Sequence, residues 1–370
     1  RASVVSAHSH PVSIVGVGTW LPERVQDNTA WPEAFAQRAL STGDRTFNDI
    51  PASRDPVAAA ILAHDLALEA NDAFLGARLR HRADDSVTAV DAETWAAQVA
   101  LAQAGIAPDQ VDLVLSYGIV PDRITPSGAG AVAHRLGATR ALAFGVDAAC
   151  ATAITQLEIA HAYIASGLAN VVVLTQSHLM LRTVPLLHPA APGLGDGATA
   201  MVVARGPGLA IRATYGVTHG EYMNAVAWVR GRDDASDPPW WKQGGDLHIG
   251  SRVPEQAKLL MQETVSYGAE TVRSVVTRAG VDVERIAVLA SVQPRGFIPG
   301  AIAERLGLPR ERAVTTYDVI AHVGASGPVF NLVRAQERGM LVPGAIIALY
   351  GQGAGFTRAA ALLEVSAKAL

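Results

Sequence analysis

The sequence predicts an α/β fold built from two similar halves, and three observations support this prediction. Short runs rich in β-branched residues alternate with Ala-rich helical stretches along the 370 residues, which is typical of a sheet covered by helices on both faces. The runs VVVL and AIIAL are apolar throughout, as expected of strands buried on both sides. Finally, segments of the first half recur in the second half in the same order.

The recurring segments keep a nearly constant spacing. AGIAPDQVDLVLS is followed much later by AGVDVERIAVLAS, RLG by a second RLG, and SGLANVVVL by RGMLVPGAIIAL. The offsets are 175 between Ala104 and Ala279, 170 between Arg135 and Arg305, and 172 between Gly167 and Gly339. A general likeness of all helix–loop–strand units is the alternative explanation. The shared order and spacing favour a duplication, with halves spanning 11–205 and 206–370.

The expected elements follow from hydrophobic periodicity. The expected strands are Val12–Val17, Val111–Tyr117, Ala141–Asp147, Val171–Thr175, Ala198–Ala204, Leu209–Tyr215, Ile286–Val292, Ala313–Tyr317, Ala345–Tyr350 and Ala359–Glu364. The expected helices include Ala92–Ala104, Ala151–Ser166, Glu255–Ala279 and Gly327–Arg338. Residues 1–10 have no apolar stretch of the kind found in signal peptides, and we expect a disordered tail there.

Composition excludes several functional classes. The chain is 49% hydrophobic and 17% charged with a net charge of −4, and it has no basic stripe that would neutralise nucleic-acid phosphates. It has no run of about 18 apolar residues, so we expect no membrane span. One cysteine rules out an internal disulfide and a cysteine-rich metal site, and it fits a reducing cytoplasm. We expect no metal and no redox cofactor.

The duplication places the only cysteine and one histidine at equivalent positions. In the first half, the strand ending at Asp147 leads into a helix that begins near Cys150. In the second half, the strand ending near Asp318 leads into a helix that begins after His322. The numbers 322 and 150 differ by 172, which is the offset of the repeat. Both residues are therefore expected at the carboxyl end of a strand, where α/β sheets bind ligands.

A cysteine at a helix N-terminus is suited to nucleophilic chemistry. The thiolate is the reactive form, and the unpaired N–H groups and dipole of a helix N-terminus lower the pKa of a thiol. An imidazole within reach would activate the sulfur further. The alternatives are that Cys150 is a small buried hydrophobic residue and that His322 is a core or capping histidine. The duplication favours the catalytic interpretation, because it sets the two residues opposite each other.

Four segments carry a resemblance to a known family. They are VSIVGVGTWLPERV, FGVDAACATAITQLEIAHAYIASG, GDGATAMVV (195–203) and GQGAGFTRAAALLE (351–364). In this order they resemble the ketoacyl synthase III group of the thiolase superfamily, over residues 11–26 and 78–366. The resemblance implies a thiolase-like fold with two pseudo-symmetric halves in a five-layered αβαβα arrangement. It also implies an acyl group carried on Cys150, a homodimer, and an insertion near residues 27–75.

The chain departs from that group at two motifs. The family's HQAN motif reads Val292-Gln293-Pro294-Arg295 here, so Val292 replaces its histidine. The asparagine of GNTSAAS is replaced by His322, as in the GHPLGASG motif of thiolases, although the second catalytic cysteine of thiolases is missing. In the resembled synthases, the histidine and asparagine stabilise the enolate formed when malonyl thioester loses CO₂. Val292 has no hydrogen-bond donor in its side chain, so it cannot stabilise the enolate.

These departures favour acyl transfer over carbon–carbon condensation. The resemblance implies an acyltransferase of natural-product biosynthesis that takes an acyl group from an acyl carrier protein, or from coenzyme A, onto Cys150. The acceptor is a small-molecule hydroxyl, amine or carbon. We expect His322 to act as the general base, and the backbone N–H groups of Cys150 and Ala354 to hold the oxyanion. Two alternatives stay open: a decarboxylating β-ketoacyl synthase III that primes a polyketide, and an inactive partner subunit.

The resemblance also points to the substrate pocket. Thr125 stands where a partner subunit's aromatic side chain lines the pocket in this family, which implies a roomier pocket, with Val292 and Trp240 as further lining residues. His188 and Gln293 are possible catalytic contributors, although a surface role is favoured for His188, and solvent-facing packing of Trp240 is as plausible as a place in the pocket wall. The arginine and tryptophan that bind the adenine of coenzyme A are missing around Ala70–Arg78, which favours a phosphopantetheine-bearing carrier protein as donor.

Overall fold

The computed structural model describes residues 10–41, 53–230, 240–242, 244–245 and 247–367. The expected tail at residues 1–10 lies outside these ranges except for His10. Within the described ranges, no helix combines the length and the apolar character needed to cross a membrane.

A ten-stranded mixed sheet forms the framework of the molecule. Its strand order is β12-β11-β13-β14-β8-β1-β7-β6-β4-β5. The strands of the first half are β1 (Val12–Trp20), β4 (Leu113–Gly118), β5 (Leu142–Gly145), β6 (Val171–His178) and β7 (Gly197–Arg205). Those of the second half are β8 (Leu209–Thr218), β11 (Ile286–Ser291), β12 (Ala313–Val314), β13 (Ile346–Gly353) and β14 (Thr357–Val365).

The two sets of five strands repeat the same pairing pattern. In the first half, β4 pairs in parallel with β5 and β6, while β7 is antiparallel to β6 and to β1. In the second half, β11 pairs in parallel with β12 and β13, while β14 is antiparallel to β13 and to β8. A short antiparallel pairing of β1 with β8 joins the halves. The predicted pseudo-symmetry of the fold is confirmed.

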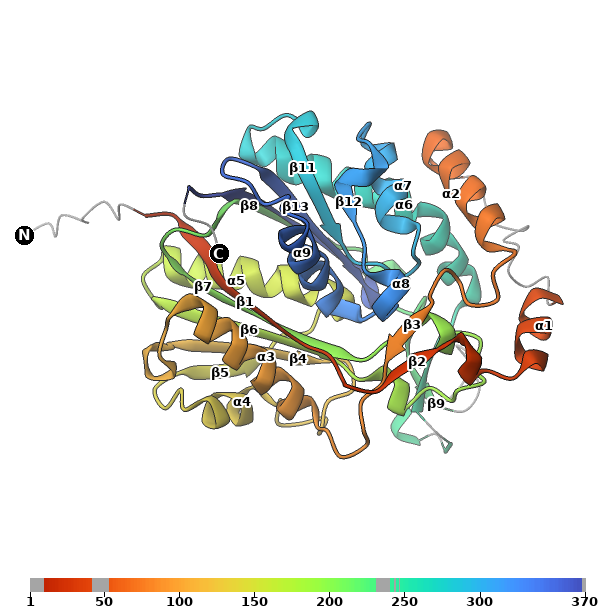
Figure 1. The fold of residues 1–370 in the computed structure, drawn as a ribbon, viewed down its shortest axis with the longest axis horizontal. Coiled ribbons are helices and arrows are strands. Elements are labelled where there is room, and N and C mark those ends of the chain that lie inside the picture. Colours follow the sequence, from red (N-terminus) through yellow and green to blue (C-terminus); the bar gives the residue numbers. More distant parts are fainter. Residues whose placement is uncertain (1–9, 42–52, 231–239, 243, 246, 368–370) are drawn as a thin grey trace, which may run out of the picture.

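Helices complete five layers (Figure 1). The inner layer is α5 (Thr152–Ala165) and α9 (Gly327–Glu337), whose side chains share one apolar core with strands of both halves. Helices α3 (Ala89–Ala104) and α4 (Ala129–Leu136) pack on the outer face of the first half. Helices α6 (Pro254–Ala279) and α7 (Ile298–Arg305) pack on the outer face of the second half. This is the expected αβαβα arrangement.

The region near 27–75 contributes helices to one side of the molecule. Two short strands, β2 (Val25–Asp27) and β3 (Leu79–His81), pair with each other and flank α1 (Glu33–Ser41) and α2 (Pro56–Glu69). Figure 1 shows α2 beside α6 and α7, and its apolar face joins their core. Ion pairs from Arg305 to Asp55 at 2.6 Å and from Arg310 to Asp65 at 2.9 Å bind α2 to the second half.

The structure corrects one expected strand. The stretch predicted as Ala313–Tyr317 leaves the sheet after Val314, and α8 (Tyr317–Ile320) follows. The side-chain oxygen of Gln293 accepts hydrogen bonds from Thr315 Oγ1 at 3.0 Å and Thr316 N at 3.2 Å, which turns the chain out of the sheet. The prediction also omitted α1, α2, α4, α7 and the hairpin of β9 (Ala227–Arg230) and β10 (Leu247–Gly250). Most of these elements are short, and their local patterns are weak.

Gly16 and Gly18 on β1 have no side chain, which allows α3 to pack directly against the strand. A Cβ on Gly18 would lie 2.0 Å from the carbonyl oxygen of Ala96 and 2.6 Å from the nitrogen of Ala100. We predict that Gly18→Ala lowers the free energy of unfolding by about 3 kcal/mol, because the helix would have to move. Gly130→Ala on α4, where no atom lies within 4 Å of the added methyl group, is the control and should be neutral or stabilising by up to about 1 kcal/mol. Urea unfolding of both variants measures the difference, and equal stabilities would contradict this account of the packing.

Candidate active site

Cys150 and His322 meet at the inner layer of the fold. Cys150 lies in the 3-10 helix η4 (Ala149–Ala151) that leads into α5, and His322 lies two residues before η11 (Gly324–Ser326), which leads into α9. The sulfur of Cys150 is 3.6 Å from Nε2 of His322, and both residues are partly buried. The structure therefore brings together the two residues that the repeat predicted to be opposite each other.

Each of the two residues follows an alanine in an unusual backbone conformation. Ala149 has φ +48° and Ala321 has φ +56°, and these alanines are also 172 positions apart. Such conformations cost about 1–3 kcal/mol and persist only where the surroundings enforce them. On the histidine side, backbone hydrogen bonds from His322 N to Gly193 O at 2.9 Å and from Gly195 N to His322 O at 3.0 Å supply the restraint.

The electrostatic environment keeps the pair uncharged at rest. Burial raises the pKa of Cys150 to about 12, and the negative charge of Asp147 acts in the same direction. Burial lowers the pKa of His322 to about 4. The expected lowering of the thiol pKa by a helix N-terminus is therefore wrong for this site, because loss of hydration outweighs the helix dipole. At neutral pH the pair is a thiol beside a neutral imidazole.

The two residues of the altered HQAN motif face the protein rather than a substrate. Val292 is 1% exposed and belongs to the core beneath α6 and α7. Gln293 is fully buried, and its amide nitrogen donates to Thr316 Oγ1 at 3.1 Å and to the carbonyl of Ala321 at 2.9 Å. Its oxygen accepts from Asn331 Nδ2 at 3.0 Å. The side chain of Gln293 thus holds the residue that precedes His322.

Ala354 lies beside the nucleophile segment. Strand β13 ends at Gly353, where a Cβ would lie 2.7 Å from the nitrogen of Cys150, and Ala354 begins the next turn, η12 (Ala354–Phe356). Ala354 and Ala149 line the same cavity of about 340 Å³. Its other walls are mainly apolar and include Tyr117, Met223, Val226, Trp228 and Ile249. A cavity of this lining is suited to an acyl chain.

The remaining predicted site residues lie elsewhere. His188 lines a separate cavity of about 700 Å³ with Phe35 and Tyr317, and its Nδ1 accepts a hydrogen bond from Ala190 N at 3.2 Å. Thr125 is exposed and precedes Pro126 through a cis peptide bond. Trp240 begins the 3-10 helix η8 (Trp240–Lys242), and its side chain is outside the described part of the structure. Among the described residues, no group of three or more His, Cys, Asp or Glu is placed to hold a metal ion.

Sequence reasoning overlooked His178. This histidine ends β6 and is 3% exposed, and its ring centroid lies 5.5 Å from that of His322 with an angle of 71° between the planes. Its Nδ1 lies 2.7 Å from the carbonyl oxygen of Gly195. Burial lowers the pKa of His178 to about 3, and the neighbouring His322 adds to this effect. Its place at the carboxyl end of a predicted parallel strand was a usable signal, since such ends gather at one crevice.

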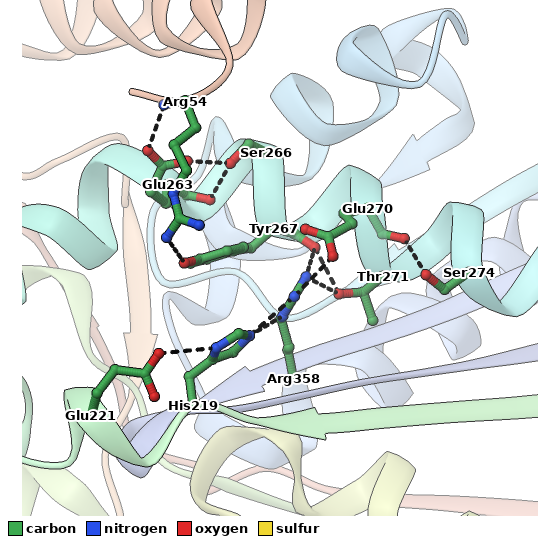
Figure 2. A network of polar contacts seen from close by, with 10 residues as sticks. All are labelled: Arg54, His219, Glu221, Glu263, Ser266, Tyr267, Glu270, Thr271, Ser274 and Arg358. Atoms are coloured by element: carbon green, nitrogen blue, oxygen red, sulfur yellow. Dashed lines mark hydrogen bonds and ion pairs between the residues drawn. The ribbon is translucent and has the colours of Figure 1, made fainter. Parts of the chain in front are cut away.

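A polar network that includes His219, Glu270 and Arg358 (Figure 2) lies next to the turn that carries Ala354. Phe356 of this turn exchanges backbone hydrogen bonds with His219, at 2.8 Å and 3.3 Å. Arg358, which is 3% exposed, donates to Nε2 of His219 at 3.1 Å and to Glu270 of α6 at 3.1 Å. The guanidinium of Arg358 also lies over the ring of Tyr267, 4.4 Å from its centroid. Helix α6 is thereby linked to the loop beside Cys150.

Family descriptions match two parts of the chain. The description "3-Oxoacyl-[acyl-carrier-protein (ACP)] synthase III" matches residues 144–218, and its C-terminal counterpart matches residues 276–365. A relative from Bordetella petrii named beta-ketoacyl-[acyl-carrier-protein] synthase III is 27% identical over 93% of this chain and 95% of its own length. A Streptomyces coelicolor relative, named beta-ketoacyl-[acyl-carrier-protein] synthase III 3, is 29% identical over 95% of this chain and 96% of its own.

Solved structures share the fold over nearly the whole chain. The 3-oxoacyl-(acyl carrier protein) synthase III of Pseudomonas aeruginosa superposes with a TM-score of 0.76 and 26% identity, covering 96% of this chain and 98% of its own. The priming beta-ketosynthase of the R1128 polyketide pathway superposes with a TM-score of 0.76 and 21% identity, covering 98% and 99%. At 21% identity, the similarity to the priming beta-ketosynthase shows a shared fold only.

The neutral state of the pair predicts slow alkylation of Cys150 at neutral pH. Because iodoacetamide reacts with the thiolate and the thiol pKa is about 12, the alkylation rate should rise about tenfold per pH unit between pH 6 and pH 9. Intact-protein mass spectrometry of timed reactions measures this rate. A rate that is constant over this range would indicate a thiolate–imidazolium pair instead and would contradict the assignment.

The network of Figure 2 predicts a stability effect at Arg358. Replacing Arg358 by Met removes its hydrogen bonds to the Tyr267 carbonyl, to Thr271 Oγ1 and to Glu270, so we expect a loss of about 2 kcal/mol. Arg334→Met on α9 is the control, because Arg334 is 46% exposed and forms a surface ion pair with Glu337, and such pairs contribute about 0–1 kcal/mol. Guanidinium chloride unfolding compares the two variants, and similar losses would argue against the network.

Proposed function

We propose that the chain is a ketoacyl synthase III-like enzyme of the thiolase-type fold that moves an acyl group from a carrier-protein or coenzyme A thioester, through an acyl-Cys150 intermediate, to a hydroxyl, amine or carbon acceptor. The observation that supports this proposal most directly is the 3.6 Å contact between the sulfur of Cys150 and Nε2 of His322. It provides a nucleophile with a base in reach.

Acylation of Cys150 begins from the neutral pair. His322 Nε2 accepts the thiol proton as the sulfur attacks the thioester carbonyl, since a thiol with a pKa of about 12 does not ionise beforehand. The tetrahedral intermediate collapses by breaking the carbon–sulfur bond of the donor. The departing pantetheine thiolate takes the proton from His322. The products are acyl-Cys150 and a free donor thiol.

In the transfer to a hydroxyl or amine, the acceptor is the nucleophile and Cys150 is the leaving group. His322 accepts the proton of the acceptor while its oxygen or nitrogen attacks the acyl-Cys150 carbonyl. When the second intermediate collapses, the sulfur of Cys150 leaves and recovers the proton from His322. One histidine therefore serves both half-reactions, and no further acid or base is required.

Two backbone donors would stabilise both tetrahedral intermediates. The N–H of Cys150 and the N–H of Ala354 belong to segments that lie against each other, as the close approach of Gly353 to the nitrogen of Cys150 requires. In related chemistry, one such donor contributes about 10²–10³ to the rate. The bracing of the η12 turn through His219 and Arg358 supports this assignment, because a donor must be fixed before the charge develops.

The decarboxylating alternative is supported by the names of the relatives, which are β-ketoacyl synthases III. It needs hydrogen-bond donors for an enolate, and Val292 supplies none. His178 does not replace them, because a ring whose Nδ1 donates to the Gly195 carbonyl has no hydrogen on Nε2 while it is neutral. Nor does His188, which lines the other cavity. We therefore place acyl transfer first and condensation second.

Finer features of the function belong to the same proposal. We propose an acyl carrier protein as the preferred donor, with coenzyme A as the second choice, and a role in natural-product biosynthesis in the cytoplasm. We also propose a homodimer, in which the exposed Thr125 of one subunit borders the acyl cavity of the other. The cavity of about 340 Å³ beside Ala149 fits short to medium acyl chains.

Intact-protein mass spectrometry against acyl thioesters tests the proposal. We expect the protein to gain the mass of an acyl group from at least one of acetyl, butyryl, hexanoyl or malonyl carrier protein, and Cys150→Ala to gain none. His322→Asn should acylate about 10²–10⁴ times more slowly, because it lacks the general base. Gln336→Asn, a change of the same size on the far end of α9, should acylate normally.

Two results would separate the alternatives. Release of CO₂ from malonyl carrier protein that depends on Cys150 would overturn the preference for acyl transfer and favour condensation. Absence of acylation by every donor, in a protein that is folded, would favour the inactive partner subunit.

A further inference from the structure

We propose that His178 is a positioning residue for His322, and that its ring holds the imidazole with Nε2 directed at the sulfur of Cys150. This inference rests on the proposed function, in which His322 is the base. It assigns a task to a buried histidine that no part of the acyl-transfer scheme uses. The claim is one of orientation: His178 acts through His322 and does not touch the acyl group.

His322 lacks the usual means of orientation. In most catalytic sites, the second nitrogen of the base histidine donates to a carboxylate or carbonyl, which fixes both the ring and its tautomer. Here Nδ1 of His322 is buried and has no hydrogen-bond partner in the described part of the chain. A weak backbone hydrogen bond with Gln293 favours the protonated ring, but Nδ1 makes no hydrogen bond within the normal limits of distance and angle. Packing must therefore set the angle of the ring.

His178 provides that packing. The two imidazoles meet edge to face, with centroids 5.5 Å apart and planes at 71°, an arrangement that aromatic rings prefer. A rotation of His322 about its side-chain bonds would drive its ring into His178 or away from Cys150. The contact thus restricts His322 to orientations close to the one in which Nε2 faces the sulfur.

The ring of His178 is itself fixed through a residue, Gly195, that also binds His322. Nδ1 of His178 donates to the carbonyl of Gly195 at 2.7 Å, and the nitrogen of Gly195 donates to the carbonyl of His322 at 3.0 Å. A shift of either histidine therefore disturbs the same residue. These hydrogen bonds restrain the loop that carries His322 relative to β6, the strand that ends at His178.

The backbone makes room for the ring of His178 at a specific place. Gly324 has φ +54°, and a Cβ there would lie 2.4 Å from Cδ2 of His178. Any side chain at residue 324 would displace the ring. The tight fit shows that the loop between His322 and α9 is shaped around this imidazole.

A neutral ring is suited to this task better than a carboxylate. Burial keeps both rings neutral, and geometry separates their roles: Nδ1 of His178 is bound to the Gly195 carbonyl, whereas Nε2 of His322 lies 3.6 Å from the sulfur. The His322 ring thus lies between the thiol of Cys150 and an imidazole that stays uncharged. The proton has one destination, which is His322.

Three substitutions at His178 test the inference. His178→Ala removes the ring, His178→Phe keeps an edge-to-face ring without the hydrogen bond, and His178→Gln keeps a donor for Gly195 without the ring. His161→Phe on α5, away from the site, is the matched control. The readouts are the maximal acylation rate of Cys150, the donor concentration at half-maximal rate, and the titration of His322 followed by NMR of ¹³C-labelled histidine, assigned with His322→Asn.

Positioning by the ring gives a distinct pattern. We expect His178→Ala and His178→Gln to lower the maximal acylation rate about 10–100-fold with little change in the half-saturating donor concentration, because a displaced base loses rate rather than binding. His178→Phe should stay within about fivefold of the wild type. In His178→Ala the pKa of His322 should rise by about 1–2 units. In the wild type, burial keeps this ring neutral, whereas in the variant water can reach it.

Other patterns would overturn the inference. A wild-type acylation rate and an unchanged His322 titration in His178→Ala would show a merely structural residue. Activity retained in His178→Gln but lost in His178→Phe would assign the effect to the hydrogen bond with Gly195. If His178→Ala fails to fold, the Phe and Gln variants decide the question. If wild-type protein accepts no acyl group, the proposed function fails, whereas the NMR titration still tests whether His178 shapes the environment of His322.

Discussion

The contact between the sulfur of Cys150 and the imidazole of His322 joins the two halves of the molecule at equivalent positions, and much of the surrounding structure serves to hold it. Both residues follow an alanine with positive φ, and both precede a helix of the inner layer. On the sulfur side, Gly353 of β13 lies so close to the segment before Cys150 that a Cβ added to Gly353 would be 2.3 Å from the carbonyl oxygen of Ala148. The strain of these turns is balanced by the packing of ten strands and two inner helices around them.

Desolvation decides how this pair works. A helix N-terminus would favour a thiolate in water-accessible surroundings, but burial raises the pKa of Cys150 and lowers that of His322. In the proposed mechanism, proton transfer therefore accompanies the attack on the thioester. This arrangement protects the cysteine from reagents that need a thiolate, and it makes the orientation of the imidazole the critical variable. A base that must accept the proton during attack has to be aligned beforehand.

The region near 27–75 supports that alignment indirectly, through Arg80, which lies just beyond it. Arg80 is fully buried, donates to the carbonyl of Pro192 at 2.6 Å, and lies 4.6 Å from the centroid of the Trp31 ring. The next residue along, Gly193, accepts the hydrogen bond from His322 N. Trp31 of this region thus packs against the buried guanidinium of Arg80, which supports the loop that carries the proposed base. Its helix α2 is tied in turn to α6 and α7 by ion pairs.

The sequence by itself determined the two-half α/β fold, the strands of both halves and the pairing of Cys150 with His322, because a duplication repeats buried periodic segments at one offset. Only the tertiary structure decided the charge state of the pair, the structural role of Gln293 and the presence of His178 beside His322. Those features depend on burial and on contacts between residues far apart in the chain, such as Gln293 with Asn331 and His178 with Gly195. Local patterns place His178 near the end of a strand, but they do not specify these contacts or the charge state of the pair, because hydration and long-range packing arise only when the layers close.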